Sequence, residues 1–194
     1  MAATESTMLA LGTAAPDFSL PDYNGKLHDL TEFKQAKGLV VAFICNHCPF
    51  VKHVRTEFAR FARDYQARGV AVVAIVSNDL ESYPQDGPAG MKAEAESVGY
   101  SFPYLVDATQ TVAKAYQAAC TPDFYLFDGQ QKLVYRGQFD ASRPGNGIPV
   151  TGADLRAAVD AMLAGRPAAT EQLPSIGCNI KWKAGNAPAY FWGS

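Results

Sequence analysis

The sequence predicts an α/β fold with a central sheet that is covered on both faces. Residues 38–44 and 70–76 are continuous apolar runs of the kind that form fully buried strands. Between them, residues 49–68 place apolar side chains at helical spacing and indicate an amphipathic helix. Buried strands that alternate with helices are typical of a sheet between helical layers, so we expect one α/β domain.

The first half of the chain predicts a hairpin followed by the first strand and helix of the sheet. In order, we expect hairpin strands at 18–20 and 26–28, a helical turn at 31–34, a central strand at 38–45 and a helix at 49–68. Asn24-Gly25 supports the hairpin because this pair suits a tight turn, and Gly69 is a stop signal for the helix. The apolar face of the helix consists of Val51, Val54, Phe58, Phe61 and Tyr65.

The second half predicts the rest of the sheet and a last helix. In order, we expect a strand at 70–76, a loop at 79–90, a helix at 91–98, a strand at 104–106, a helix at 109–118, a hairpin of 124–127 and 132–136, a loop at 142–149 and a helix at 151–164. Thr151 is expected to cap the last helix, with Asp154 in a capping box, and Gly165 to end it. Residues 166–194 show no clear periodicity.

Composition restricts the class of protein. The chain has 194 residues, enough for one domain with a substantial core, and its net charge of −2 offers no basic surface to a nucleic acid. No apolar run approaches the ~18 residues of a membrane span, and residues 1–7 lack the features of a secretory signal. We therefore expect a cytoplasmic protein with no nucleic-acid or membrane partner. Four cysteines are too few for a disulfide scaffold and indicate redox catalysis or metal binding.

The most informative motif is Cys45-Asn46-His47-Cys48-Pro49, between the first central strand and the helix that follows. Because proline is favoured at the first helical position, Cys48 is expected at the N-cap. Its sulfur would lie near the free N–H groups and the positive end of the helix, which favour a thiolate. Such a site lowers the pKa of a cysteine from ~8.5 to roughly 3.5–7.5, so Cys48 is a candidate nucleophile.

With a CxxC motif after the first central strand, this order of elements resembles the thioredoxin fold. Residues 12–21 (GTAAPDFSLP) are similar to the opening of the peroxiredoxin (AhpC/TSA) branch, and Thr121-Pro122 stands where thioredoxins carry a cis-proline before a strand. The resemblance covers residues 8–165. It implies a thioredoxin-like domain with a mixed central sheet flanked by helices and a peroxiredoxin-type N-terminal β-hairpin.

The resemblance also implies the chemistry, since the thioredoxin and peroxiredoxin patterns both select Cys48 as the nucleophile. The usual thioredoxin partner cysteine would fall on Val51, and the peroxiredoxin pattern puts Cys45 in the place of a peroxide-orienting threonine and Thr121 in that of an arginine. We expect a thiol-dependent oxidoreductase, with antioxidant activity, that attacks a peroxide or a protein or small-molecule disulfide. It would need no cofactor, and thioredoxin or a low-molecular-weight thiol would restore the dithiol.

Three cysteines remain open as the thiol that closes a disulfide with Cys48. Cys45 either does so or ends the strand buried and inert. Cys120 lies on the segment expected to face Cys48, or is a packed strand residue, and Cys178 lies in the tail, where some peroxiredoxins carry a resolving cysteine. His47 either stabilises the thiolate or shuttles a proton, or it is an exposed loop residue.

Pro122 is the remaining site residue that the resemblance implies. A cis bond there would hold the backbone of Thr121 open beside Cys48, so that a peptide or a mixed disulfide could pair with it. The alternative is a proline at the start of an edge strand.

Metal binding is the competing chemistry. Cys45, His47, Cys48 and His53 are ligand types, but a second closely spaced pair is missing, so we expect no native metal site. The competing function is a module that captures a soft metal or a client protein through the same thiols without turnover.

Two arrangements of the tail at 166–194 remain open: it packs either on its own domain or on a partner subunit in a homodimer. Residues 120–125 and 177–183 resemble a peroxiredoxin-like subgroup of thioredoxin-fold proteins. That likeness extends the resemblance into the tail.

Overall fold

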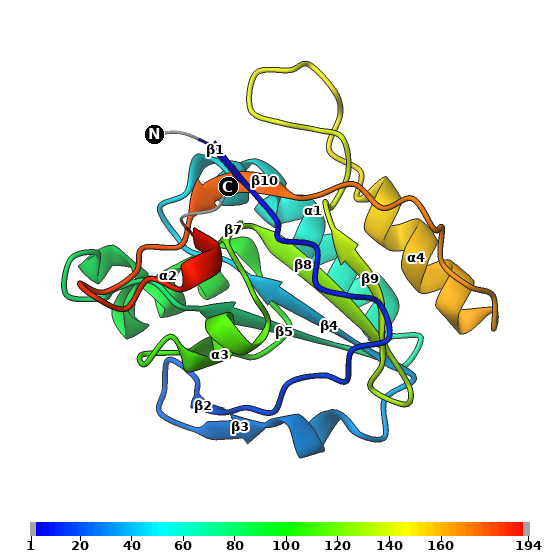
Figure 1. Cartoon of the computed structure of the whole chain (residues 1–194), viewed down its shortest axis with the longest axis horizontal. Coiled ribbons are helices and arrows are strands. Elements are labelled where there is room, and N and C mark those ends of the chain that lie inside the picture. The colour runs from blue at the N-terminus through cyan, green and yellow to red at the C-terminus, as the bar shows by residue number, and fades with distance from the viewer. Residues whose placement is uncertain (1–2, 192–194) are drawn as a thin grey trace.

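A mixed five-stranded sheet forms the centre of the molecule in the computed structural model, which describes residues 3–191 (Figure 1). Its strand order is β6-β5-β4-β8-β9. The strands are β4 (Gly38–Phe43), β5 (Val70–Val76), β6 (Tyr104–Val106), β8 (Asp123–Asp128) and β9 (Leu133–Gly137). β4, β5 and β6 run parallel, whereas β8 and β9 are antiparallel to their neighbours, so the predicted mixed sheet is confirmed.

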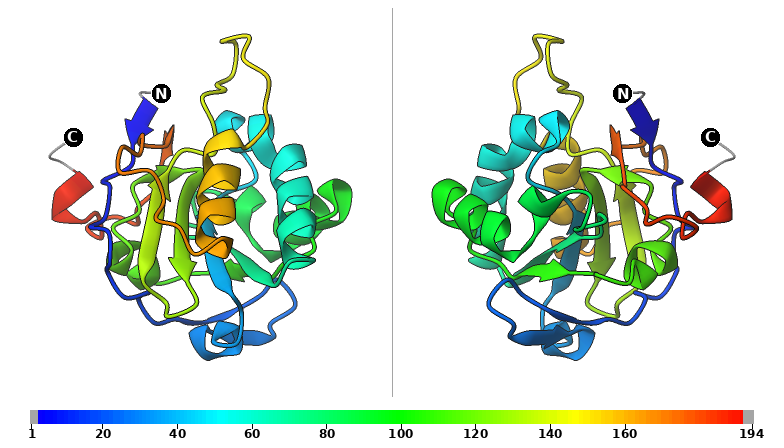
Figure 2. Two further views of the ribbon diagram at one scale, coloured as in Figure 1. Left: turned by 90° about the vertical axis from the view of Figure 1, so that its right-hand side faces the viewer. Right: turned by 90° about the vertical axis from the view of Figure 1, so that its left-hand side faces the viewer.

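The two faces of the sheet pack against different elements. On one face, Val40 and Ala42 of β4 belong to a core with α1 (Pro49–Gln66), α2 (Pro88–Val98) and α4 (Ala153–Leu163), and Figure 2 shows α1 and α4 side by side. On the other face, Val41 and Phe43 meet α3 (Thr111–Ala115) and the N-terminal hairpin. The alternation follows from the two-residue period of a strand, and both layers of the predicted α/β fold are present.

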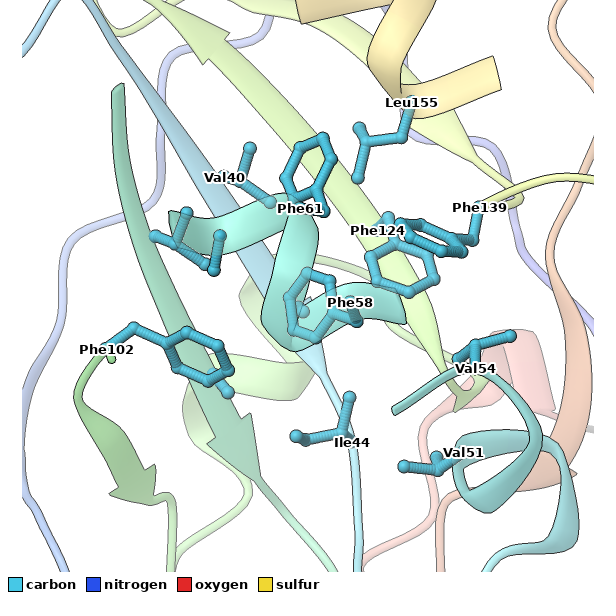
Figure 3. Packing of buried hydrophobic residues seen from close by; sticks show 14 of the residues in the cluster. Val40, Ile44, Val51, Val54, Phe58, Phe61, Phe102, Phe124, Phe139 and Leu155 are labelled. Atoms are coloured by element: carbon cyan, nitrogen blue, oxygen red, sulfur yellow. The ribbon is translucent and has the colours of Figure 1, made fainter. Parts of the chain in front are cut away.

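Aromatic side chains hold α1 against the sheet. Figure 3 shows Phe58 and Phe61 of α1 pointing between Val40 of β4, Phe124 of β8 and the nearby Phe139. The ring centroids of Phe58 and Phe124 lie 5.3 Å apart in an edge-to-face arrangement. Burial of one such side chain stabilises the folded state by roughly 1.5–3 kcal/mol. Because Phe58 and Phe61 are both buried against the sheet, they fix the position of α1 relative to β4.

A second sheet of three short strands lies at the end of the central one, in the order β1-β10-β7. Its strands are β1 (Ala3–Glu5), β7 (Cys120–Thr121) and β10 (Ile176–Asn179), all antiparallel to their neighbours. β10 belongs to the tail for which no element was predicted. It lies between the N-terminal strand and the segment just before Pro122.

The predicted hairpin at the N-terminus is confirmed as β2 (Ser19–Pro21) and β3 (Leu27–Asp29), with Gly25 at a φ of +84° in the turn. The other short elements are 3-10 helices, η1 (Leu30–Phe33), η2 (Pro84–Asp86) and η3 (Ala189–Phe191). The loop predicted at 79–90 therefore contains η2 and the first residues of α2.

Two predictions about helix ends are wrong. The helix expected at 109–118 is shortened to α3. It does not begin earlier because Gln110 has a φ of +62° and its side-chain amide donates to the carbonyls of Ser77 and Lys181. Thr151 does not cap α4: the N-cap is Gly152, and both of their backbone N–H groups donate to the Asp140 carboxylate. The capping box fails because the Asp154 side chain accepts from Gln138 instead.

Within residues 3–191, no helix combines the length and the apolar character that a bilayer crossing requires. The cytoplasmic location, the domain boundary near residue 165 and the homodimer all stay predictions.

The close approach of β10 to β7 requires glycine at position 177. A Cβ atom there would lie 1.9 Å from the Thr121 carbonyl oxygen, a backbone atom with little room to move. We expect Gly177→Ala to reduce the free energy of unfolding by roughly 1–3 kcal/mol, measured by urea denaturation. Gly129→Ala is the control, because its Cβ would meet nothing closer than 3.4 Å, and it should change stability by less than about 0.5 kcal/mol. Equal stability of the two variants would contradict the packing described here.

Candidate active site

Cys48 occupies the predicted N-cap of α1, with Pro49 in the first turn. Its side chain is fully buried, and as a thiol it donates to the carbonyl oxygen of Thr121 at 3.2 Å. No side-chain capping hydrogen bond closes the first turn, but the N–H of Val51 lies close enough to favour the anionic sulfur. The helix start therefore brings one buried thiol beside two backbone polar groups, the Thr121 carbonyl and the Val51 N–H.

The neighbouring Cys45 thiol has the largest influence on this sulfur, and it lowers the pKa of Cys48 to about 5. Burial opposes that effect, while the Val51 amide, the Cys178 thiol and the Thr121 hydroxyl support it. The prediction of a low pKa therefore agrees with the structure, but its leading cause is a thiol donor rather than the helix end.

The pKa of Cys45 is shifted in the opposite direction. Its interaction with Cys48, its own burial and the charge of Asp86 raise its pKa well above the usual value of a thiol. The Cys45 sulfur lies 3.5 Å from the Thr121 hydroxyl oxygen. The two thiols therefore titrate as a coupled pair, in which Cys48 is favoured to lose the first proton and Cys45 to keep the second.

The loop between the two cysteines is held by Asp86, which sequence reasoning missed. This fully buried carboxylate accepts from the backbone N–H of Asn46 at 2.8 Å and of His47 at 3.3 Å, and from the Asn78 amide at 2.8 Å. Asp86 lies in η2, inside a segment without hydrophobic periodicity, so no pattern in the sequence distinguished it from other loop carboxylates.

His47 is only partly exposed, so the interpretation as an exposed loop residue is wrong. Its Nδ1 lies 2.6 Å from an oxygen of Asp86, and its ring stacks on Tyr83 with the centroids 5.2 Å apart. Its Nε2 is buried and has no hydrogen-bond partner among the described residues. The ring is therefore oriented by a carboxylate, in an arrangement that suits proton transfer.

One group of possible metal ligands occurs in the part of the chain that the structure describes. Single ligand atoms of Cys45, His47 and Asp86 all lie within 4.8 Å of one another. The Asp86 oxygens, however, already accept from Asn46, His47 and Asn78, so hydrogen bonds account for the arrangement. The expectation of no native metal site stays a prediction.

Thr121 and Pro122 lie beside the two cysteines, and the peptide bond between them is cis. The expectation of an open backbone at Thr121 is wrong for this conformation. Thr121 is paired with Cys178 of β10, so the chain's own tail occupies the edge that was expected to receive a peptide.

The two remaining cysteines differ in their relation to Cys48. Cys178 is nearly buried, and burial followed by its interaction with Cys48 raises its pKa. Cys120 is fully buried, its sulfur faces the carbonyls of Pro122 and Ser175 at 3.7 and 3.9 Å, and burial raises its pKa. All four cysteines are free, and among them Cys45 and Cys178 are the ones whose side chains lower the pKa of Cys48.

Comparison with known proteins agrees with this fold. The model of the AhpC/TSA family matches residues 11–136. The thiol-disulfide oxidoreductase ResA of Geobacillus thermodenitrificans is 29% identical over 136 residues, which are 69% of this chain and 74% of that protein. A hypothetical protein from Sinorhizobium meliloti 1021 has a solved structure that is 59% identical, with a TM-score of 0.92, and the alignment covers 94% of this chain and 100% of that one.

A more distant structure shows the fold alone. The thioredoxin domain of a thiol-disulfide oxidoreductase from Bacteroides vulgatus is 20% identical, with a TM-score of 0.57 over 67% of this chain and 89% of that one. The predicted thioredoxin-like fold is confirmed. Since the family model spans more than half of the residues and includes the cysteine motif, the chain belongs to the AhpC/TSA family and is a thiol-dependent oxidoreductase.

Proposed function

We propose that the protein exchanges disulfides, with Cys48 as the nucleophile and Cys45 as the thiol that resolves the mixed disulfide. The observation that supports this proposal best is the division of charge between the two thiols. The pKa of Cys48 is lowered to about 5 by the Cys45 thiol, and that of Cys45 is raised by the same interaction. One sulfur is ready to attack while the other keeps its proton.

The first half-reaction forms a mixed disulfide. The Cys48 thiolate attacks one sulfur of a substrate disulfide, a new S–S bond forms, and the other substrate sulfur leaves as a thiolate that takes up a proton. Cys48 then carries no negative charge. The main cause of the raised pKa of Cys45 is thereby removed, and Cys45 can ionise.

The second half-reaction releases the reduced substrate. Cys45 loses its proton and attacks the Cys48 sulfur, and the second substrate thiol leaves and accepts a proton. The substrate has gained two electrons, and the enzyme holds a Cys45–Cys48 disulfide. An external reductant, thioredoxin or a low-molecular-weight thiol, returns it to the dithiol, and we keep the cytoplasm as the proposed location.

Peroxide reduction is the second candidate. The observation that favours it is the position of Cys48 at the N-cap just before Pro49, as the peroxiredoxin pattern requires. Against it, Thr121 stands where that pattern places an arginine, and a hydroxyl offers less charge stabilisation to a leaving oxygen. A binding module for metal or client proteins would use the same thiols without turnover.

The charge division predicts how Cys48 titrates. In wild type, one thiol should ionise with a midpoint near 5, followed by the ultraviolet absorbance of the thiolate. Cys45→Ala removes the strongest stabilising group and should raise that midpoint toward ~8.5, so that less thiolate is present at pH 7. Cys120→Ala is the matched control and should leave the midpoint unchanged. An unchanged midpoint in Cys45→Ala would refute the assigned cause.

The proposed exchange predicts a distinct pattern of activity. Cys48→Ser should abolish reduction of a mixed or small disulfide, whereas Cys120→Ser should retain it. Stopped-flow reaction of the reduced protein with hydrogen peroxide should be no faster than that of a free thiol. A peroxide rate far above a free thiol would favour peroxidase function, and stoichiometric metal with no disulfide turnover would favour the binding module.

A further inference from the structure

We propose that Cys178 is a second in-chain disulfide partner of Cys48, carried by a strand that occupies the edge where an extended client would pair. The inference rests on the proposed role of Cys48 as the nucleophile. It gives the tail a redox function that the exchange between Cys45 and Cys48 does not require.

The pairing of β10 with β7 puts Cys178 beside the site. Cys178 is opposite Thr121 in an antiparallel ladder, and Asn179 is opposite Cys120. Residues opposite each other extend their side chains to the same face, and the next pair extends to the other face. Cys178 therefore shares the face of Thr121, whose hydroxyl oxygen lies 3.5 Å from the sulfur of Cys45, whereas Cys120 belongs to the opposite face.

The backbones of the two strands are in close contact at this point. Gly177 leaves no space for a Cβ atom against the Thr121 carbonyl, the same group that accepts from the Cys48 thiol at 3.2 Å. Figure 1 shows β10 lying between β1 and β7. An extended client cannot pair with Thr121 while this strand is seated.

Hydrogen bonds fix β10 on both sides of Cys178. Before it, the Ser175 hydroxyl donates to the Pro122 carbonyl at 2.5 Å. After it, the Ile180 N–H donates to the Ala119 carbonyl at 3.0 Å, and the Lys181 N–H to the side-chain oxygen of Asn78 at 2.9 Å. Asn78 also donates to Asp86, so the strand and the cysteine loop are held by one network.

The charge on Cys48 determines when Cys178 can react. In the reduced protein, burial and the Cys48 sulfur raise the pKa of Cys178, while Lys181 lowers it. When Cys48 becomes part of a neutral mixed disulfide, the contribution of its charge disappears. Cys178 then loses its proton and attacks the Cys48 sulfur, the Cys48–Cys178 bond forms, and the substrate leaves as a thiol with that proton.

Oxidation of a variant without Cys45 tests this step. Reduced Cys45→Ala is treated with glutathione disulfide, quenched in acid, alkylated, digested and analysed by mass spectrometry without reduction. We expect a peptide pair linked through Cys48 and Cys178, with loss of the glutathione adduct from Cys48. Cys45→Ala/Cys120→Ala should give the same linked pair. Cys45→Ala/Cys178→Ser should instead retain glutathione on Cys48, with circular dichroism confirming that each variant is folded.

Two results would overturn the inference, and they separate it from the proposed function. A stable glutathione adduct on Cys48 of Cys45→Ala, with Cys178 still open to alkylation, would remove Cys178 from the chemistry and leave Cys48 as the nucleophile. No reaction of Cys48 with glutathione disulfide in wild type or in Cys45→Ala would overturn both proposals.

Discussion

The site depends on the position of Thr121, which lies beside Cys45, Cys48 and Cys178. Its carbonyl oxygen lies 3.2 Å from the Cys48 sulfur, its hydroxyl lies beside Cys45, and its backbone pairs with Cys178. That position follows from the central sheet, because β8 begins two residues later and pairs with β4 in the register Phe43 to Asp123. The same register that buries the core thus brings Cys45, two residues beyond the end of β4, beside Thr121.

Two effects can stabilise the Cys48 thiolate, the N-terminus of α1 and the Cys45 thiol, and their sizes can be compared. A helix N-terminus contributes about 0.3–1 kcal/mol to a nearby negative charge, less than one pKa unit. A fall in the pKa of Cys48 to about 5 needs more than that, and the Cys45 thiol is its largest cause. The CxxC spacing therefore serves both parts of the proposed exchange, since it places Cys45 where it would close a disulfide with Cys48 and where its thiol lowers the pKa of Cys48.

Much of the central sheet could be predicted because its buried strands consist of long apolar runs. The position of Cys48 could also be predicted, since Pro49 identifies the start of α1. Asp86 could not, because its role arises from a three-residue helix that the fold brings against the cysteine loop. β10 could not be predicted either, because its four residues show no alternating pattern of apolar and polar side chains. One of the strands that it pairs with, β7, has only two residues. The predicted cap of α4 is wrong because Asp140, earlier in the loop that leads into the helix, accepts from the backbone N–H groups of Thr151 and Gly152.

The three-stranded sheet also has a practical consequence for work with this molecule. β1 and β10 are neighbours, with Ala3 opposite Cys178, so the first and last strands of the chain lie side by side at the candidate site (Figure 1). A purification tag or reporter domain added near either strand would emerge against the segment that covers Cys48. The exposed residues 145–149, in the loop before α4, lie outside both of these strands and offer another place to insert such a label.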